Sequence, residues 1–523
     1  MGGEAPKEGL RWDKLTPNWD EVGSPWRGEG RNRSPELPKS GNCQLERPQP
    51  ERFAAEEARL EGARISTVNT AVQSAGVLSF EDAYEVVREH RGQILKAGDR
   101  PSEEVLLLQS AGRVLAEPVK ADRDFPPFPR ATRDGFAVRA DDLARGVTLL
   151  RVVGQVRAGD TYDLPVASGE AVEIMTGAAV PAGADAVVMV EYTERKSQEV
   201  NHKGHEGTQR EVSEDRGGIG DDDNVLDIAS NKSPEPEEKR IEDLVEIQRT
   251  VVAGENIVPA GAEAQAGQEL LPRGVRLGPA QIALAAAAGK ASVKVYRKPK
   301  VAILSTGDEL VEVAEKPGPS QIRNSNSYSL AALVKEFGGE PVQLPIAPDE
   351  QGKLTELIQE GLKANMLLLS GGVSMGKFDL VEQALNTLGA KFFFTGALIQ
   401  PGKPVVFGEA RATPFFGLPG NPVSVMVTFE LFARQVVEAL SGAEPERLKS
   451  AKAKLKKEFK TKTGLTRFLP ARLAGGLDGP EVEAVPWQGS GDMLAAARAN
   501  CYLVVPPDRE KLVRGEMVTV VMR

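Results

Sequence analysis

The sequence holds 523 residues, and a single hydrophobic core stops growing beyond about 250–300 residues, so several domains are expected. The formal net charge of −10 argues against general nucleic-acid binding, which needs a basic surface. Two cysteines and three histidines disfavour a disulfide framework and histidine-based zinc catalysis. No apolar run approaches the roughly 20 residues of a membrane span, and the first residues lack the apolar core of a signal peptide. We therefore expect a cytoplasmic protein that binds neither nucleic acid nor a membrane.

The N-terminal part changes character near residue 78. Residues 1–77 are rich in Pro, Gly, Arg and Glu without sustained periodicity, which is typical of a disordered extension. Ser79 and Asp82 then match the start of a capping box. The apolar residues on one face of the expected helix are Ala83, Val86, Val87 and Ile94. The sequence therefore predicts that order begins with a helix at Ser79.

Two further regions are expected to be rich in β structure. Between Thr148 and Tyr192 short apolar runs alternate with glycines, which predicts a small all-β domain. Residues 195–248 are charged, punctuated by Gly and Pro and poor in aromatics. They predict a disordered insertion in a hairpin or loop, with a regulatory docking segment as the alternative. After Gly442 the runs become β-like again and predict a C-terminal barrel or sandwich.

From Lys300 onward strands alternate with helices, which predicts a doubly wound, mostly parallel sheet. Three apolar strands end in the polar segments TGDE, SGGVS and LPGNP. Glycines after a strand let a ligand approach the backbone, and successive N–H groups there can hold an anion. Each loop alone could be an ordinary βα turn. Three of them at the carboxyl edge, where such sheets bind ligands, favour a ligand site.

The polar residues of these loops suit an anionic ligand. Asp134, Asp308 and Asp379 supply carboxylates, and Lys403 supplies a cation in the segment PGKP. The sequence contains no Ser-His-Asp set, no Walker A lysine loop and no G-x-G-x-x-G that opens a helix after a strand. We therefore predict a phosphate-bearing, nucleotide-like ligand with a divalent cation, and catalysis by positioning.

In this order, TGDEL, NSNSYSL, SGGVSMGKFD, PGKP and GLPGNPVS resemble the molybdopterin-binding domain of the molybdenum insertases. This family, the molybdopterin molybdenumtransferases, includes the E domain of gephyrin. PPFPRATRDGFAV, IMTGAAVPAGADAVV and WQGSGDMLAAARAN resemble further motifs of the family, so the resemblance covers about residues 78–523 apart from the insertion. It implies an enzyme of molybdenum cofactor biosynthesis that places molybdate on adenylylated molybdopterin and, with Mg²⁺, releases AMP.

The resemblance also implies roles for individual residues. The catalytic set would be Asp134, Thr176, Asp308, Asp379 and Lys403, with Asp308 and Asp379 also holding Mg²⁺. The residues that bind nucleotide, pterin or molybdate would be Ser305, Gly307, Asn326, Gly371, Gly372, Ser374, Pro419, Gly420, Asn421, Ser424 and Ser490. The structural alternatives are that Asp134 merely caps its turn and that Lys403 is a solvated loop charge.

The family's architecture implies a multidomain α/β and β protein. Its subdomains would be an elongated helical one (78–121 with 258–297), a β domain (122–257), the α/β domain (298–443) and a C-terminal β-barrel (444–523). The resemblance further implies a homodimer in which the β domain of one protomer completes the site on the sheet domain of the other. Transient contacts with the molybdopterin adenylyltransferase and with apo-molybdoenzymes are also expected.

The chain departs from the family pattern around the expected molybdate site. Gln400 stands where many members carry a second lysine, and Pro470 stands where they carry an arginine, so Arg467 or Arg472 would have to compensate. Two alternatives stay open. One is a molybdopterin adenylyltransferase on the same sheet fold, although Phe378 occupies the position of that group's arginine. The other is a gephyrin-like binding or scaffold protein that uses the acidic insertion.

Overall fold

The computed structural model describes residues 76–96, 100–201, 239–372, 380–444, 447–476 and 479–523. Residues 1–75, where a disordered extension is expected, lie outside these ranges. No helix in the described ranges is long and apolar enough to cross a lipid bilayer.

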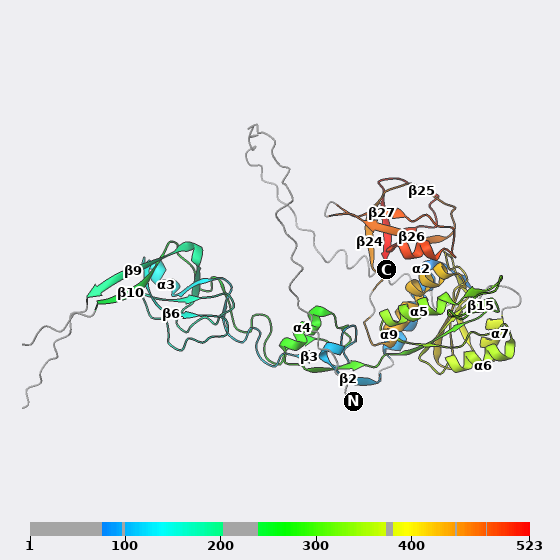
Figure 1. Cartoon of the computed structure of the whole chain (residues 1–523), viewed down its shortest axis with the longest axis horizontal. Helices are drawn as coiled ribbons and strands as arrows, with labels where there is room; N and C mark the ends of the chain where they lie inside the picture. Colours follow the sequence, from blue (N-terminus) through cyan, green and yellow to red (C-terminus); the bar gives the residue numbers. More distant parts are fainter. Residues whose placement is uncertain (1–75, 97–99, 202–238, 373–379, 445–446, 477–478) are drawn as a thin grey trace, which may run out of the picture. The chain divides into compact units, whose positions relative to one another are not determined.

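A six-stranded sheet in the order β17–β14–β18–β23–β22–β19 forms the centre of the α/β domain (Figure 1). The four parallel strands are β17 (Glu340–Gln343), β14 (Lys300–Ser305), β18 (Met366–Ser370) and β23 (Thr413–Leu418). The antiparallel additions are β22 (Val406–Ala410) and β19 (Lys391–Phe394). The predicted doubly wound, mostly parallel sheet is confirmed.

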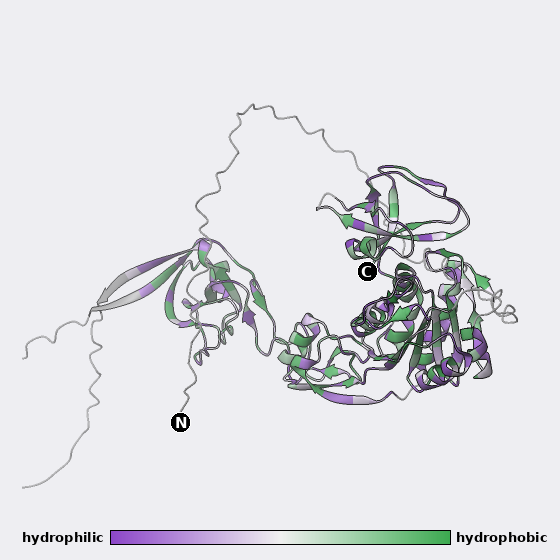
Figure 2. Cartoon of the chain, turned by 45° about the vertical axis from the view of Figure 1, so that its right-hand side comes forward, coloured by the Kyte–Doolittle hydropathy of each residue, from purple (hydrophilic) through white to green (hydrophobic). Residues whose placement is uncertain are grey.

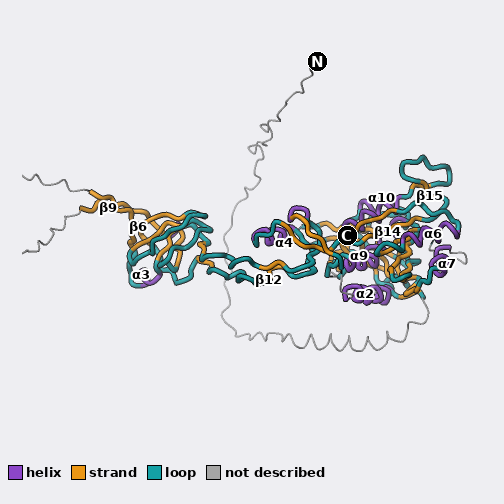
Figure 3. Tube along the Cα trace, turned by 90° about the horizontal axis from the view of Figure 1, so that it is seen from below, coloured by secondary structure: helices purple, strands orange, loops and turns teal. Residues whose placement is uncertain are grey.

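Helices cover both faces of this sheet, because successive side chains of a strand point to opposite sides. Ile303 and Leu368 belong to the core shared with α2 (Phe80–Lys96), α5 (Ser325–Glu336), α8 (Pro422–Thr428), the π-helical turn η3 (Phe429–Ala433) and α9 (Arg434–Leu440). Leu304 and Leu369 belong to the opposite core, with α6 (Gln351–Gly361) and α7 (Leu380–Thr387). Figure 3 shows these helices grouped around the strands, and Figure 2 shows hydrophobic residues gathered on the strands between them.

The N-terminal helix α2 belongs to the α/β domain, which corrects the expected boundary at residue 78. Ala83 and Val87 are fully buried in the sheet core, and Phe80 stacks edge-on against Phe468 at 5.0 Å. The predicted cap is confirmed, since the Asp82 backbone N–H donates to Ser79 Oγ at 3.0 Å. Order begins slightly earlier than expected, because β1 (Val77–Leu78) pairs with β20 (Gly396–Ala397).

The expected elongated helical subdomain is built mainly from strands. Its elements are β2 (Ser102–Leu106), η1 (Leu107–Gln109), β3 (Val119–Lys120), β12 (Glu269–Leu271), α4 (Pro279–Ala287) and β13 (Ser292–Tyr296). β13 pairs with β2 and β12 pairs with β3, so the two sequence segments form one unit. The alanine-rich segment GPAQIALAAAAGKA forms α4.

The β domain contains a six-stranded sheet in the order β8–β5–β7–β6–β10–β9. Its strands are β5 (Gly135–Val138), β6 (Leu149–Val156), β7 (Glu170–Ile174), β8 (Ala186–Met189), β9 (Thr193–Asn201) and β10 (Lys239–Ile247). Smaller elements are β4 (Arg130–Ala131), α3 (Ala140–Ala144), η2 (Val190–Tyr192) and β11 (Ile257–Val258). The expected disordered segment 195–248 is therefore corrected at both ends, where β9 and β10 pair as a hairpin and β10 continues onto β6. Residues 202–238 lie outside the described ranges.

The C-terminal region is the predicted barrel. Its strands are β24 (Ser450–Leu455), β26 (Thr466–Ala474), β27 (Glu481–Ala484), β28 (Cys501–Val505) and β30 (Met517–Met522), and the β26–β28 pairing closes the barrel. β21 (Ile399–Gln400), from the α/β domain, pairs in parallel with β26. The remaining elements are α10 (Met493–Arg498), the β25–β29 pair (Phe459–Lys460 with Lys511–Leu512) and the β15–β16 pair (Leu310–Val311 with Ile322–Arg323).

Candidate active site

Three neighbouring strands of the α/β sheet end level with one another. Ser305 at the end of β14 is in register with Ser370 at the end of β18, and Ser370 is in register with Leu418 at the end of β23. The segments at and just beyond these strand ends, residues 306–309, 370–372 and 419–421, are called the edge loops below. The prediction that the three loops share one edge is confirmed.

Asn326, in the first turn of α5, ties two edge loops together. Its Nδ2 donates to Ser370 Oγ at 2.9 Å and to the Gly420 carbonyl at 2.7 Å. Ser305 supports the loops from within the fold, because its buried hydroxyl donates a hydrogen bond to Asn324 Oδ1 at 3.0 Å. Asn324 Oδ1 also accepts from the Ser327 N–H at 3.2 Å and so caps α5. The hydroxyl of Ser305 is thus engaged by the protein, whereas Asn326 is half-buried between the loops.

Gly371 and Gly372 are glycines because the TGDE loop crosses directly over them. Both have positive φ, +92° and +62°. A Cβ on Gly371 would lie 2.6 Å from the Thr306 carbonyl oxygen, and one on Gly372 would lie 2.7 Å from Thr306 Oγ1. Neither distance is compatible with a side chain unless the loops shift. The two loops therefore present backbone, with little side-chain cover, at the sheet edge.

Two oxygen atoms of the edge are buried without a hydrogen-bond partner in the described part of the chain: Thr306 Oγ1 and Asn326 Oδ1. Thr306 is only 3% exposed. Leaving a buried polar atom unsatisfied costs about 1–3 kcal/mol, and such atoms in a native fold point to a missing partner. Thr306 was not among the predicted site residues, although it lies between two that were, Ser305 and Gly307, in the same motif.

Of the two carboxylates predicted at the edge, Asp308 lies within the described residues. Asp308 is exposed, and its Oδ1 accepts a hydrogen bond from the Asp349 N–H at 3.1 Å. Asp379 and Ser374 lie outside the described residues. Within the described ranges no group of three or more His, Cys, Asp or Glu side chains could hold a metal ion.

A second group of predicted residues gathers around the N-terminus of α8. The Val423 N–H donates to the Ser490 carbonyl at 3.0 Å, which joins the C-terminal motif to the LPGNP loop. Asn421 occupies the N-cap position of α8, but its side chain makes no capping hydrogen bond. Pro422 opens the helix, and its fixed φ suits that position. The side chain of Asn421 is left exposed and available to a ligand.

The PGKP segment, residues 401–404, packs against the same helix. A Cβ on Gly402 would lie 2.4 Å from Thr428 Cγ2, so the loop runs close along α8. The Lys403 carbonyl accepts from the Ala397 N–H at 2.9 Å, while its side chain is exposed. Ser424 and Pro419 are buried, which suits support of the loop backbone.

Asp134 and Thr176 form a separate pair in the β domain. Asp134 Oδ1 accepts from the Thr176 backbone N–H at 2.6 Å and from its hydroxyl at 2.8 Å. These two hydrogen bonds, the backbone one first, lower the pKa of Asp134 below its ordinary value. Both residues are exposed. The structure therefore brings these two predicted residues together as an ionised carboxylate held on a turn.

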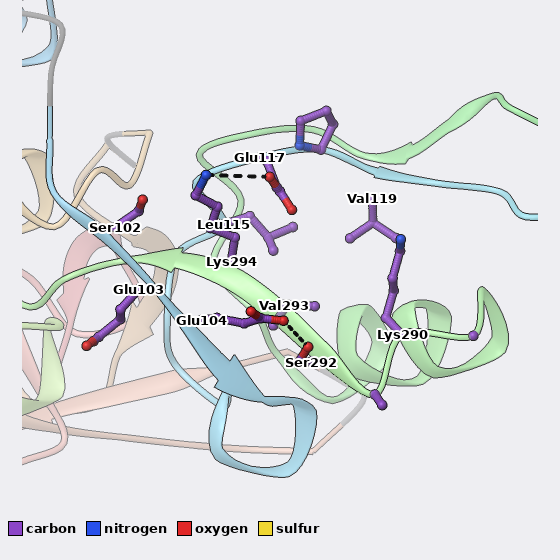
Figure 4. Close-up of a pocket in the computed structure, with 13 residues that line it drawn as sticks. Ser102, Glu103, Glu104, Leu115, Glu117, Val119, Lys290, Ser292, Val293 and Lys294 are labelled. Carbon is purple, nitrogen blue, oxygen red and sulfur yellow. Dashed lines mark hydrogen bonds and ion pairs between the residues drawn. The ribbon is translucent and has the colours of Figure 1, made fainter.

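A pocket of about 580 Å³ lies between β2, β13 and the end of α4 (Figure 4). Its charged lining is largely self-paired: Ser292 Oγ donates to Glu104, and Lys294 faces Glu117 at 3.9 Å. None of the predicted site residues lines it. The pocket therefore does not replace the sheet edge as the candidate site.

Comparison with known proteins agrees with this organisation. The chain matches the MoeA N-terminal region (domains I and II) over residues 78–289. It matches the probable molybdopterin binding domain over residues 302–439 and the MoeA C-terminal region (domain IV) over residues 452–522. The molybdopterin molybdenumtransferase of Bacillus subtilis is 32% identical over 426 residues, which are 80% of this chain and 90% of the relative. The chain belongs to the molybdopterin molybdenumtransferase family.

Other similar proteins support the same family assignment. The Haemophilus influenzae protein of the same name is 31% identical over 420 residues, 79% of this chain and 92% of the relative. The crystal structure of the molybdopterin biosynthesis MoeA protein from Pyrococcus horikoshii OT3 superposes with a TM-score of 0.62 at 26% identity, covering 86% of this chain and 100% of that one. Because the matches include the N-terminal and C-terminal regions as well as the sheet domain, the adenylyltransferase and scaffold alternatives are not favoured.

Proposed function

We propose that this molybdenumtransferase acts in molybdenum cofactor biosynthesis by inserting molybdate into adenylylated molybdopterin, with release of AMP. Family membership supports the molybdenum-insertion step. The proposal that the substrate bears a nucleotide rests on two oxygens without a hydrogen-bond partner, Thr306 Oγ1 and Asn326 Oδ1, at the edge of the sheet. A pterin or purine ring offers N–H and amino donors, and such donors would satisfy both atoms.

The edge loops support binding of the substrate's phosphates. Gly371 and Gly372 leave backbone close to the edge without side chains to obstruct an approaching ligand. Successive backbone N–H groups in a turn can form an anion-binding concavity. We assign Gly307, Gly371, Gly372 and Gly420 to this role, with Asn326 holding the loops in place. Ser374 and Asp379 remain part of the proposed set.

We propose that Mg²⁺ binds at this edge, shared between the chain and the substrate. Mg²⁺ is usually bound by one or two carboxylates together with substrate phosphates and water. Asp308 is exposed beside the glycine loop, so its carboxylate would hold the ion jointly with phosphate oxygens and with Asp379. When bound, Mg²⁺ would neutralise charge on the pyrophosphate as its bond breaks. The loop glycines and Asn326 would orient the phosphates, and Lys403 with Ser490 would hold the molybdate.

We further propose that the enzyme is a cytoplasmic homodimer in which Asp134 and Thr176 of one protomer complete the other protomer's site. The exposed, ionised carboxylate of Asp134 suits a role toward a bound ligand. Complementation tests this arrangement. Asp134→Asn and Lys403→Ala protomers, each inactive alone, should regain about a quarter to half of the activity when mixed as heterodimers. Absence of any recovery would contradict sites shared between protomers.

The function is tested by AMP release. Purified protein given adenylylated molybdopterin, molybdate and Mg²⁺ should release AMP and then activate an apo-molybdoenzyme. Asp308→Asn should lose most of this activity, whereas Asp349→Asn, whose backbone rather than side chain contacts Asp308, should retain it. Failure of the wild-type protein to release AMP would overturn the proposal. Formation of adenylylated molybdopterin from ATP would instead restore the adenylyltransferase alternative.

A further inference from the structure

Arg523 contacts two helices that belong to different domains. Its Nη1 donates to the Ala496 carbonyl at 2.8 Å and to the Ala499 carbonyl at 3.4 Å, where α10 ends in the barrel. Its Nη2 lies 4.0 Å from Met426 Sδ on α8. The guanidinium also lies over the ring of Tyr502, 5.7 Å from the ring centre. One side chain therefore contacts α10, β28 and α8.

The end of α10 is a favourable place for a cation. The last carbonyl groups of a helix have no intrahelical partner, and a positive charge near them interacts favourably with the helix dipole. After Ala499 the chain leaves the helix, because the Asn500 N–H donates to the Ala471 carbonyl on β26 at 3.0 Å. Arg523 therefore supplies hydrogen-bond donors and a positive charge at the point where α10 ends.

At its other end α10 is joined to a loop of residues 488–492, called the Ser490 loop below. Asp492 Oδ1 accepts a hydrogen bond from the Ala495 N–H at 3.1 Å, and its Oδ2 accepts one from the Gln488 N–H at 3.0 Å. The Asp492 N–H donates in turn to the Gly489 carbonyl at 3.0 Å. These three hydrogen bonds close the loop onto the first turn of α10. We therefore expect the Ser490 loop and α10 to move as one unit.

The Ser490 loop meets the candidate active site at the start of α8. The Ser490 carbonyl accepts a hydrogen bond from the Val423 N–H at 3.0 Å. A Cβ on Gly491 would lie 4.0 Å from Asn421 Oδ1, so the loop also lies beside the side chain of Asn421. Met426, which Arg523 contacts, follows Val423 by three residues on the same helix. Arg523 and the Ser490 loop therefore lie at opposite ends of α10, and both contact α8.

We propose that Arg523 is a positioning residue, which holds α10 against α8 and so fixes Ser490 beside Asn421 in the candidate active site. The inference rests on the proposed function and adds a residue that acts on the site through α10. Ala496 is 2% exposed and belongs to the same core as Val423, so the end of α10 that Arg523 binds is tightly packed. Such positioning matters for catalysis, because a displacement of about 1 Å caused by a remote mutation can cost about 100-fold in rate.

A purely structural role is the alternative, because the same contacts of Arg523 also join the end of β30 to the rest of the barrel. Arg498 offers a matched control for the two roles. It lies in the last turn of α10, is exposed, and forms no hydrogen bond or ion pair with the residues that the structure describes. Arg498→Met therefore removes a positive charge from the same end of the helix but leaves the contacts of Arg523 in place.

Amide hydrogen exchange, followed by mass spectrometry, tests the proposal without any substrate. Wild-type protein would be compared with Arg523→Met, Arg523→Lys and Arg498→Met. In Arg523→Met we expect exchange about tenfold faster in residues 488–499 and at Val423, with no change in β24 and β27, because only the local opening of α10 becomes easier. Arg498→Met should exchange like wild type. Unchanged exchange in residues 488–499 of Arg523→Met would overturn the proposal, as would an equal rise over the whole barrel, which indicates a structural role.

The kinetics of AMP release test whether this positioning serves the site. Because Ser490 is proposed to hold the molybdate, Arg523→Met should raise the KM for molybdate about tenfold and leave the KM for adenylylated molybdopterin unchanged. Arg523→Lys keeps a cation at the end of α10 but lacks the planar donors, so its KM for molybdate should be intermediate. Equal KM values for Arg523→Met and wild type would overturn the proposal. Failure of the wild-type protein to release AMP would overturn the proposed function, whereas the exchange experiment examines Arg523 independently of activity.

Discussion

Thr176 donates two hydrogen bonds to a single carboxylate oxygen of Asp134, one from its backbone at 2.6 Å and one from its hydroxyl at 2.8 Å. Both stabilise the charged form of the acid, so Asp134 is ionised at neutral pH. An acid held in this way can accept hydrogen bonds from a ligand or bind a cation, but it is a poor proton donor. In the proposed site it therefore orients a group and does not supply a proton.

Thr176→Val should shift the acid limb of the pH–activity profile to higher pH. The variant keeps the backbone donor but removes the hydroxyl, so the pKa of Asp134 should rise toward its ordinary value. Thr176→Ser, which retains a hydroxyl, should leave the limb in place. The measurement is AMP release as a function of pH. Identical acid limbs for the valine and serine variants would show that Asp134 does not control activity.

Thr306→Val should impair substrate binding without destabilising the fold. The hydroxyl is buried and has no partner in the described chain, so its removal costs the protein no hydrogen bond. Without this hydroxyl, the enzyme would form one hydrogen bond fewer with the substrate. KM should therefore rise about three- to tenfold. Thermal unfolding and AMP-release kinetics would measure the two effects.

Thr413→Val is the matched control for Thr306→Val. Thr413 is also buried, but its hydroxyl donates to the Leu362 carbonyl at 3.0 Å. This variant should lose about 1 kcal/mol of stability with little change in KM. If Thr306→Val behaved like Thr413→Val, Thr306 would be a structural residue.

The α/β domain could be predicted well because its signals are local. Continuous apolar runs such as Leu367–Leu369, each followed by glycines, indicate buried parallel strands, and their carboxyl ends necessarily meet at one edge. The packing of α2 on the sheet could not be predicted, because the partner of its apolar face cannot be read from the sequence. Ala83 and Val87 pack on the sheet more than 200 residues later in the chain.

For the candidate site, the sequence predicts the motifs but not the contacts between their residues. The contact of Asp134 with Thr176 joins residues 42 positions apart, and it has no local sequence signal. Thr306 could have been proposed from its place in TGDEL, but its unsatisfied hydroxyl is a property of the packed loops. The same limit applies to Asn421, which has the residue type of a helix cap without forming one.

Gly371→Ala should abolish most activity, because the added methyl group would push apart two edge loops that cross at this point. The new Cβ would lie 2.6 Å from the Thr306 carbonyl oxygen, so the loops must separate. We expect AMP release to fall more than about tenfold, because small displacements of positioning groups are costly in catalysis. Gly389→Ala is the control, since Gly389 has a similar φ of +78° but nothing within 4 Å of the added atom. Both variants should lose about 1–2 kcal/mol from positive φ, and equal activities would contradict the role of the crossing.

His90 should make the fold less stable as the pH falls from 7.5 to 5.5. Its ring lies 5.2 Å from those of Phe393 and Phe407, and burial lowers its pKa below the ordinary 6.5, an effect that the nearby Glu409 only partly offsets. Below pH 6.5 the unfolded chain therefore binds a proton that the folded chain resists, so the free energy of unfolding falls with falling pH. The contribution is at most about 1.4 kcal/mol per pH unit for one proton. His90→Phe keeps an aromatic ring but cannot ionise, so urea unfolding at a series of pH values should show a flatter dependence in this variant. Parallel curves for the two proteins would mean that His90 is protonated as easily in the fold as outside it.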